Sequence, residues 1–373
     1  MADPRTPKQD GFYAPAEWSN HSCCLIAWPW RTDVWPYGAS RAREAYLEAI
    51  RNVCATERVI LVAKPGTLSE HYMKALGKEI DSGQVEVCHL DCSESWMRDT
   101  GPTFVVSRDG SSMRGVNWVF NGWGGTLLDC CADMKLAGDL CEHRFHCGVY
   151  SPDLVCEGGA LAWDGDGTVV TTESVLLNDN RNGKGKTKAQ VEKQLLEYLG
   201  CEKVIWLPRG VYGDDDTNGH VDNLVAFVQP GEVVLCWTDD IQDPQYLISV
   251  RAELILKEAT DARGRRLTIH HLHQPDPVYF TAEEEATIES SGEIVTCWRA
   301  GKRLPASYVN FYIANKAVVV PQYNQFTQDK QALEVLKRLF PERKVIGVPA
   351  RDIVAGGGGI HCITQQVPAT VSS

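Results

Sequence analysis

Basic residues are scarce in this sequence and long apolar runs are missing. The 373 residues include 37 Lys and Arg against 49 Asp and Glu, a net charge of -12. Because phosphate binding needs clustered basic side chains, this balance argues against a nucleic-acid partner. No apolar stretch approaches the roughly 20 residues that cross a bilayer. The polar N-terminal residues also lack the apolar core of a signal peptide. We therefore expect no membrane partner and a cytoplasmic location.

The chain also lacks linkers, low-complexity stretches and any compact cysteine framework. Its 14 cysteines are scattered along its whole length. Without a secretory signal such thiols normally stay reduced, so we expect most of them to be small buried hydrophobes. With no segment that divides the chain, we predict a single domain over residues 1–373.

What the sequence does contain is an alternation of helical and strand patterns. Apolar residues three or four apart predict helices at residues 41–55, 68–80, 188–199, 244–259 and 328–340. Short β-branched runs predict strands at residues 59–62, 85–90, 204–207, 267–272 and 344–348. This alternation indicates an α/β fold.

A second pattern recurs, in which a polar residue opens a short apolar strand, a turn follows and a Val-rich strand returns. Copies open near Asp99, Glu157, His220 and Asn310, and a shorter element begins at Cys362. Residues 23–30 (CCLIAWPW) are a sixth candidate. The spacing favours a ring of similar modules, whose opening residues would meet at one end of the axis. Ordinary hairpins in a doubly wound sheet are the alternative.

The polar residues that begin these repeated units are of types that can act in catalysis. They are Asp99, Glu157, His220 with Asp222, and Cys362. If GHVDNLVAF is a strand, His220 and Asp222 point to the same face. Cys362 follows four glycines, which allow close backbone approach to a ligand. His220 is the natural proton-transfer partner for this thiol, whereas His361 would point the other way.

Carboxylates around a thiol raise its pKa, so this cluster needs a cation to be useful. A guanidinium ion meets that need, because its N–H groups match carboxylates and its carbon accepts a thiolate. Taken singly, the residues have plainer interpretations. Asp99 and Glu157 fit turn caps, and His220 with Asp222 fits a buried pair.

Longer motifs resemble those of the agmatine deiminases, in particular the plant-type enzymes, within the guanidino-group-modifying superfamily. They are PAEW (15–18), SWMRDTGPT (95–103), NGWGG (121–125), EGG (157–159), WLPRGVYGDDDTNGHVDN (206–223), SYVNFYIAN (307–315) and GGGGIHCITQQ (356–366). The resemblance implies a five-bladed α/β propeller. It also implies hydrolysis of agmatine to N-carbamoylputrescine and ammonia in putrescine and polyamine biosynthesis, with no metal or cofactor, by a homodimer.

The same resemblance implies roles for individual residues. Cys362 would form a covalent amidino-cysteine intermediate while His220 shuttles protons. Asp99 and Asp222 would clamp the guanidinium, and Glu157 would orient His220 or the reacting nitrogens. Further substrate contacts are implied for Asp216, Trp96 and Trp123.

Two other functions compete with this assignment. CEHRFHC (141–147) packs two cysteines and two histidines into a short stretch, so a zinc-containing binding protein is the non-enzyme alternative, although the spacing fits no common zinc motif. Arginine deiminase or peptidyl-arginine deiminase activity is the alternative within the enzymes. Arginine would require a cation for its carboxylate, whereas the acidic residues 214–216 suit the ammonium of agmatine.

Overall fold

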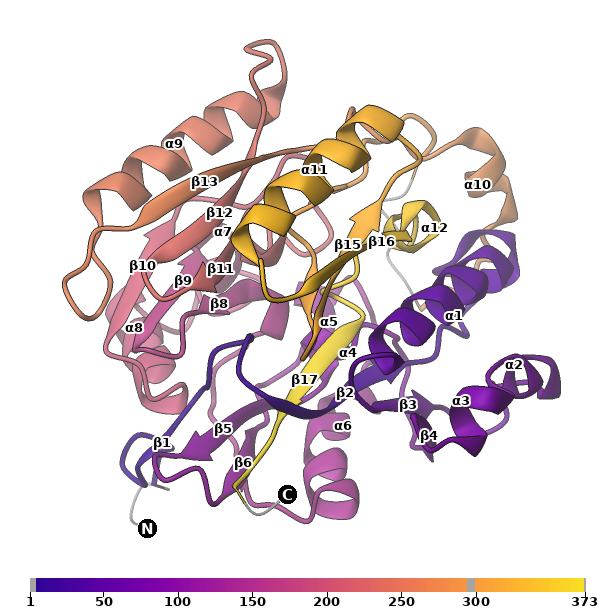
Figure 1. Cartoon of the computed structure of the whole chain (residues 1–373), viewed down its shortest axis with the longest axis horizontal. Helices are drawn as coiled ribbons and strands as arrows, with labels where there is room; N and C mark the ends of the chain where they lie inside the picture. Colours follow the sequence, from indigo (N-terminus) through magenta and orange to yellow (C-terminus); the bar gives the residue numbers. More distant parts are fainter. Residues whose placement is uncertain (1–4, 294–298, 372–373) are drawn as a thin grey trace.

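The computed structural model describes residues 5–293 and 299–371, and within these residues the strands form five separate sheets (Figure 1). In chain order of their hairpins the sheets are β1(Phe12–Tyr13)-β5(Thr103–Ser107)-β6(Met113–Val116)-β7(Val149–Tyr150), β8(Leu161–Trp163)-β9(Thr168–Thr172)-β10(Lys203–Leu207), β11(Val225–Gln229)-β12(Glu232–Trp237)-β13(Thr268–His273), β14(Tyr312–Ile313)-β15(Ala317–Gln322)-β16(Lys344–Pro349), and β17(Thr364–Pro368)-β2(His21–Ala27)-β3(Val59–Ala63)-β4(Val85–His89). The doubly wound sheet is therefore not formed, and the five-bladed α/β propeller is confirmed.

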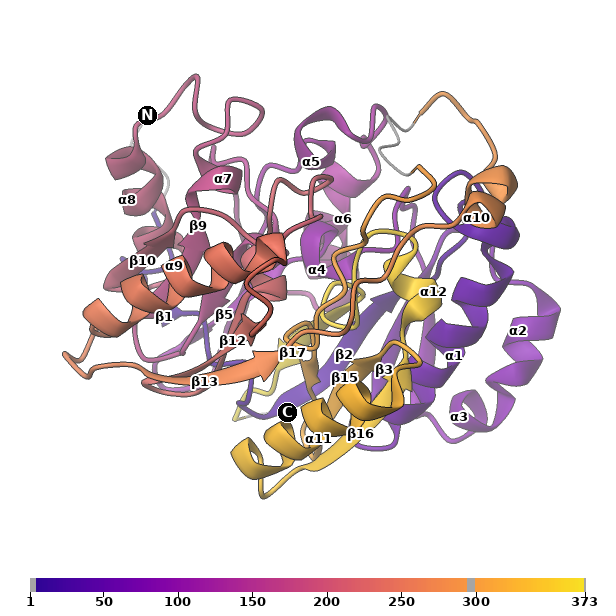
Figure 2. The same ribbon diagram turned by 90° about the horizontal axis from the view of Figure 1, so that it is seen from above.

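Each blade has the same plan, an antiparallel pair followed by a parallel strand. A parallel partner requires a crossover, which a helix supplies in every blade. These crossover helices are α1 (Ser40–Cys54), α6 (Asp133–Asp139), α8 (Lys188–Tyr198), α9 (Pro244–Glu258) and α11 (Phe326–Leu339). In Figure 1 they surround the strands, with α8 and α9 on the left, α11 at the top, α1 on the right and α6 at the bottom; Figure 2 shows the same elements turned by 90°.

Shorter helical segments occupy the connections. They are α2 (Glu70–Ala75), α3 (Gly77–Asp81), α4 (Met97–Thr100), α5 (Gly122–Gly125), α7 (Glu173–Leu176), α10 (Ala282–Thr287) and α12 (Arg351–Val354), the 3₁₀ turns Pro36–Ala39, Gly158–Ala160 and Val221–Asn223, and the π-helical turn Leu140–Arg144.

Most predicted elements are confirmed to within two residues, and three differ. The helix predicted at residues 68–80 is split into α2 and α3 at Leu76 and Gly77. The run after Gly219 is a 3₁₀ turn rather than a strand, and β11 begins only at Val225. The last strand starts at Thr364, so Cys362 lies in the turn before it.

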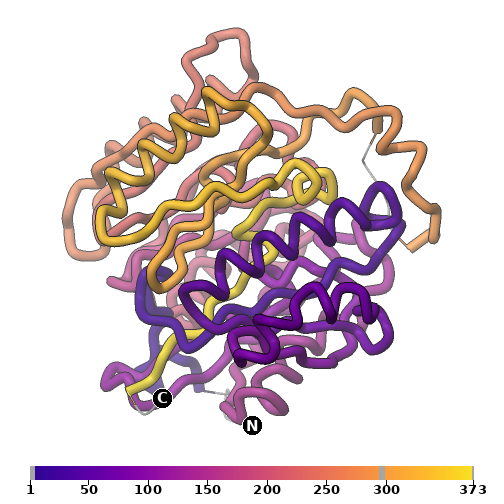
Figure 3. Tube along the Cα trace, turned by 45° about the vertical axis from the view of Figure 1, so that its right-hand side comes forward, coloured from indigo at the N-terminus to yellow at the C-terminus, as the bar shows by residue number. Residues whose placement is uncertain are grey.

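The two ends of the chain close the ring. The sixth candidate is not a separate module, because β2 pairs antiparallel with β17, with Leu25 opposite Gln365. The yellow C-terminal strand accordingly lies beside the indigo N-terminal segment in Figures 1 and 3. Residues far apart in sequence are thus neighbours in one blade.

Buried side chains fill the space between strands and crossover helices. All residues of β3, β8, β9 and β17 are buried, as expected for strands covered on both faces. In the described part of the chain, no helix is long and apolar enough to cross a membrane.

Candidate active site

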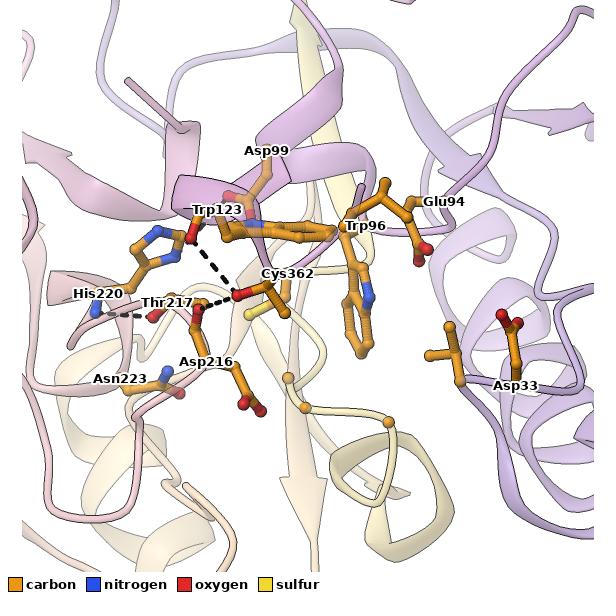
Figure 4. A pocket seen from close by; sticks show the side chains of 16 residues that line it. Asp33, Glu94, Trp96, Asp99, Trp123, Asp216, Thr217, His220, Asn223 and Cys362 are labelled. Carbon is orange, nitrogen blue, oxygen red and sulfur yellow. Dashed lines mark hydrogen bonds and ion pairs between the residues drawn. The ribbon is translucent and has the colours of Figure 1, made fainter. Parts of the chain in front are cut away.

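A cavity lies where the openings of the modules meet, and it encloses about 680 Å³ of space that is partly open to solvent. Its lining consists of Asp33, Val34, Glu94, Trp96, Asp99, Trp123, Thr126, Leu127, Asp216, Thr217, His220, Asn223, Gly356, Gly357, Gly358 and Cys362 (Figure 4). No Lys or Arg occurs among the described residues of this lining, whereas four are Asp or Glu.

The predicted catalytic residues lie close together, each in the segment before the first strand of an antiparallel pair. Asp99, His220 and Cys362 line the cavity, whereas Glu157 and Asp222 are not among its lining residues and contact His220 and Cys362, respectively. Asp99 belongs to α4 before β5, and Glu157 precedes the 3₁₀ turn that leads to β8. His220 and Asp222 flank the start of the turn before β11, and Cys362 precedes β17. The ring therefore brings them to the same end of its axis.

His220 is surrounded by carboxylates. Its Nδ1 lies 3.9 Å from Asp99 Oδ1, and its Nε2 lies 3.5 Å from Glu157 Oε2. Burial alone would lower the pKa of His220, but Asp99, Glu157 and Asp222 outweigh it and raise the pKa to about 9. The imidazole is therefore a proton donor at neutral pH.

Cys362 is a buried thiol in contact with a carboxylate and an amide. Its Sγ lies 3.5 Å from Asp222 Oδ2, and Asn310 Nδ2 donates to it at 3.2 Å. Burial, followed by the charges of Asp222 and Asp99, raises the pKa of Cys362 well above its usual value. The thiol is therefore protonated in the free pocket.

Asp222 is held on its other side by His361. Its Oδ2 lies 3.0 Å from His361 Nδ1, and His361 Nε2 lies 2.9 Å from Glu17 Oε1. Burial would raise the pKa of Asp222, but the bond to His361 prevails and lowers it. His361 does point away from the main cavity, into a small second one that it shares with Glu17 and Asp222.

The two predicted tryptophans and Asp216 line the same cavity. Trp123 Nε1 donates to Asp99 Oδ2 at 3.0 Å, which fixes that carboxylate. Trp96 stands between Cys362 and the pair Glu94 and Asp33 in the view of Figure 4. Burial raises the pKa of Asp216 to about 7, against the opposing charge of Lys302 at 3.7 Å.

Sequence reasoning missed several residues that hold this site. Arg181 donates to Glu157 Oε1 at 2.6 Å. Asn310 contacts the thiol, and its position at the opening of the fourth hairpin was the available signal. Glu17 lies inside the PAEW motif, but nothing local indicated its bond to His361.

The CEHRFHC segment does not form a metal centre. In the described ranges, no three His, Cys, Asp or Glu side chains are grouped as ligands. Instead Cys141 is buried in the π-helical turn, and His146 Nδ1 contacts the carbonyl of Glu142 at 3.0 Å. The geometry gives the zinc alternative no support.

Known proteins resemble this chain over its whole length. A family model described as Porphyromonas-type peptidyl-arginine deiminase matches residues 13–368. The agmatine deiminase of Medicago truncatula is 44% identical over 377 residues, with 98% of each chain covered. A putative agmatine deiminase of Mycoplasma mycoides subsp. mycoides is 44% identical over 371 residues, again with 98% of each covered.

A solved structure also resembles the chain. The agmatine deiminase of Enterococcus faecalis, captured catalysing its reaction, matches with a TM-score of 0.92 and 35% identity over 100% of both chains. The chain therefore belongs to the Porphyromonas-type peptidyl-arginine deiminase family, and the two relatives that are 44% identical to it are named agmatine deiminase and putative agmatine deiminase.

Proposed function

We propose that this protein is an agmatine deiminase, which hydrolyses agmatine to N-carbamoylputrescine and ammonia. The observation that carries the proposal is the charge of the cavity: four acidic residues, a thiol and a protonated histidine, with no Lys or Arg among its described lining residues. A substrate with a cation at each end and no carboxylate fits such a lining.

The guanidinium end belongs beside Cys362. Asp99 and Asp222 accept hydrogen bonds from its N–H groups. Its positive charge offsets the negative charges of these two carboxylates beside the thiol. Binding thus lowers the pKa of the Cys362 thiol, whose proton leaves to solvent as the substrate enters.

Reaction then proceeds in two steps. The Cys362 thiolate attacks the guanidinium carbon, and protonated His220 gives its proton to one nitrogen, which leaves as ammonia. Neutral His220 next takes a proton from water, and the resulting hydroxide attacks the amidino-cysteine carbon. Collapse of this adduct breaks its bond to Cys362, whose sulfur takes up the hydroxyl proton of the adduct, and leaves the neutral ureido group of the product. Glu157 keeps His220 oriented throughout.

The ammonium end of agmatine belongs with Asp216, and Trp96 and Trp123 flank the aliphatic chain. Arginine and peptidyl-arginine fit less well, because a carboxylate or a peptide group would meet Asp216 in the lining, while the nearby Lys302 lies outside the lining and pairs with Asp215 and Asp216. This charge argument favours agmatine over both alternatives.

The decisive assay measures ammonia release from agmatine, arginine and a peptidyl-arginine side by side. We expect turnover of agmatine alone to be substantial and Cys362→Ala to abolish it, with the amidino adduct detected on Cys362 by mass spectrometry. Preferred turnover of arginine would overturn the proposal.

We further propose that residues 1–373 form one catalytic domain that acts in the cytoplasm as a homodimer and supplies putrescine and polyamine biosynthesis. The family resemblance supports this setting. Light scattering on the purified protein tests the dimer, and limited proteolysis tests the single domain.

A further inference from the structure

Arg181 is a fully buried cation next to the site. Its side chain and that of Glu157 have no solvent exposure, and its Nε donates to Glu157 Oε1 at 2.6 Å. Because a buried charge requires a partner, each of the two keeps the other ionised. Arg181 is not among the residues that line the cavity, so it acts on the reaction only through its neighbours.

The two carboxylate oxygens of Glu157 face different side chains, one Arg181 and the other His220. While Oε1 accepts from Arg181, Oε2 faces His220 Nε2 at 3.5 Å. In the described part of the chain, neither Oε2 nor Nε2 has a hydrogen-bond partner. The orientation of this Glu157–His220 contact is therefore set from the Arg181 side.

Arg181 also donates hydrogen bonds to the loop that carries His220. Its Nη1 donates to Asn180 Oδ1 at 2.9 Å and to Asn218 Oδ1 at 3.3 Å. Asn218 has a left-handed φ of 66° and lies two residues before His220. A bond from Asn180 Nδ2 to Asn218 Oδ1, at 2.9 Å, completes this link.

The loop that carries Trp123 packs on the same guanidinium. Gly124 has a φ of 79°, and a Cβ there would lie 2.2 Å from Arg181 Nη1. Only glycine allows so close an approach. Loops from three different modules, which carry Trp123, Glu157 and His220, thus meet at Arg181.

We propose that Arg181 is a positioning residue for catalysis, which fixes the Glu157 carboxylate and the loop of Asn218 so that His220 stays aimed at the reacting carbon. This inference rests on the proposed function, because it concerns the proton transfers of that reaction.

The electrostatic consequence follows from the groups around the pair. The ionisable side chains that face Glu157 or His220 are Arg181, Asp99, Asp222, Asp214 and the thiol of Cys156. Burial would raise the pKa of Glu157, but the charge of Arg181 outweighs it and lowers the pKa. Without Arg181 the pKa of Glu157 rises, so the pH range in which Glu157 is ionised becomes narrower from its acidic side. His220 keeps the neighbouring charges of Asp99 and Asp222.

The test compares pH profiles of kcat and kcat/KM for wild type and Arg181→Met. We expect kcat to fall at least about 100-fold, as for loss of a general acid, with KM changed less than about threefold. The acidic limb should move to higher pH by about one unit, because Glu157 loses the cation that keeps it ionised. Arg303→Gln is the matched control, since it removes another largely buried ion pair, with Asp243 at 2.8 Å, and should leave the profile unshifted.

Arg181→Lys provides a second variant in case Arg181→Met fails to fold. Its ammonium keeps the charge but lacks the planar fork that bonds Glu157 and Asn218 together. The acidic limb should therefore stay in place while kcat falls about tenfold or more. Wild-type kcat in Arg181→Lys, or an Arg181→Met profile unshifted despite lower thermal stability, would overturn the positioning role. If the wild type fails to turn over agmatine, the proposed function is overturned instead. An NMR titration of His220 in Cys362→Ala, with and without Arg181→Met, would still test whether Arg181 acts on His220 through Glu157.

Discussion

At the scale of single residues, the thiol of Cys362 combines a nucleophilic task with surroundings that oppose it. Burial and two carboxylates keep it protonated, so the free protein is protected from adventitious thiol chemistry until a cation arrives. Substrate-dependent ionisation is the physical reason that acidic residues and a nucleophilic cysteine share one cavity.

The first prediction concerns that thiol. The difference in 240 nm absorbance between wild type and Cys362→Ala should show no thiolate step below pH 9, the ordinary value for a cysteine. A step well below neutral pH in the free protein would contradict substrate-dependent ionisation.

A second prediction concerns Asp216. Its pKa is raised to about 7, so its carboxylate is present above that pH and is lost as pH falls through it. The KM for agmatine should therefore rise between pH 8 and pH 6. Asp216→Asn should raise the KM at pH 8 by about 10- to 100-fold, which corresponds to the loss of a hydrogen bond to a charged group. In this variant the KM should no longer change with pH between 8 and 6.

Asp215→Asn is the matched control for this experiment. Asp215 is next in the chain and also pairs with Lys302, at 3.5 Å, but it is largely exposed. The slope of KM with pH should persist in this variant, and its disappearance would argue against Asp216 as the ammonium partner.

At the scale of elements, the short turn Gly158–Ala160 sets the spacing of the catalytic groups. Gly159 N donates to Asp99 Oδ1 at 2.9 Å, so backbone rather than side chain meets the site there. A Cβ on Gly159 would lie 2.5 Å from His220 Nδ1 and 3.0 Å from Asp222 Oδ2. This turn leaves no room for a methyl group.

The third prediction follows from this crowding. Gly159→Ala should lower kcat/KM at least about 100-fold, because displacement by 1 Å is enough for such a loss, while circular dichroism stays native. Gly185→Ala is the control, since its Cβ would meet nothing within 4 Å. Near-normal activity of Gly159→Ala would show that the catalytic groups tolerate displacement.

At the scale of the whole molecule, stability depends on closing the ring. Besides the β2–β17 pairing, a buried cluster ties the fourth blade to the fifth. Tyr312 O–H donates to Glu57 Oε1 at 2.5 Å, Asn315 N–H donates to Oε2 at 2.7 Å, and His21 Nδ1 lies 3.2 Å from Oε2. Glu57 thus has partners from both sides of the junction.

The fourth prediction tests this junction. Tyr312→Phe should lower the free energy of unfolding by about 1–3 kcal/mol, because it leaves a buried carboxylate oxygen short of a donor. Agmatine turnover at low temperature should remain, since Tyr312 is not among the residues that line the cavity. Tyr246→Phe, on the outer helix α9, serves as control in the same denaturant titration and should change stability far less.

The sequence by itself determined the modules and most of their chemistry. Helix periodicity, β-branched strands and the recurring hairpin are local properties, and Asp99, Glu157, His220 and Cys362 could be found because each opens such a unit. Only the tertiary structure decided which segments meet. Closure of the ring made the N-terminal strand part of the last blade, and the packing of the blades brought Arg181 and the Glu17–His361 pair to the site. These contacts join residues up to 344 positions apart, and no local pattern encodes them, because they depend on how five blades close around one axis.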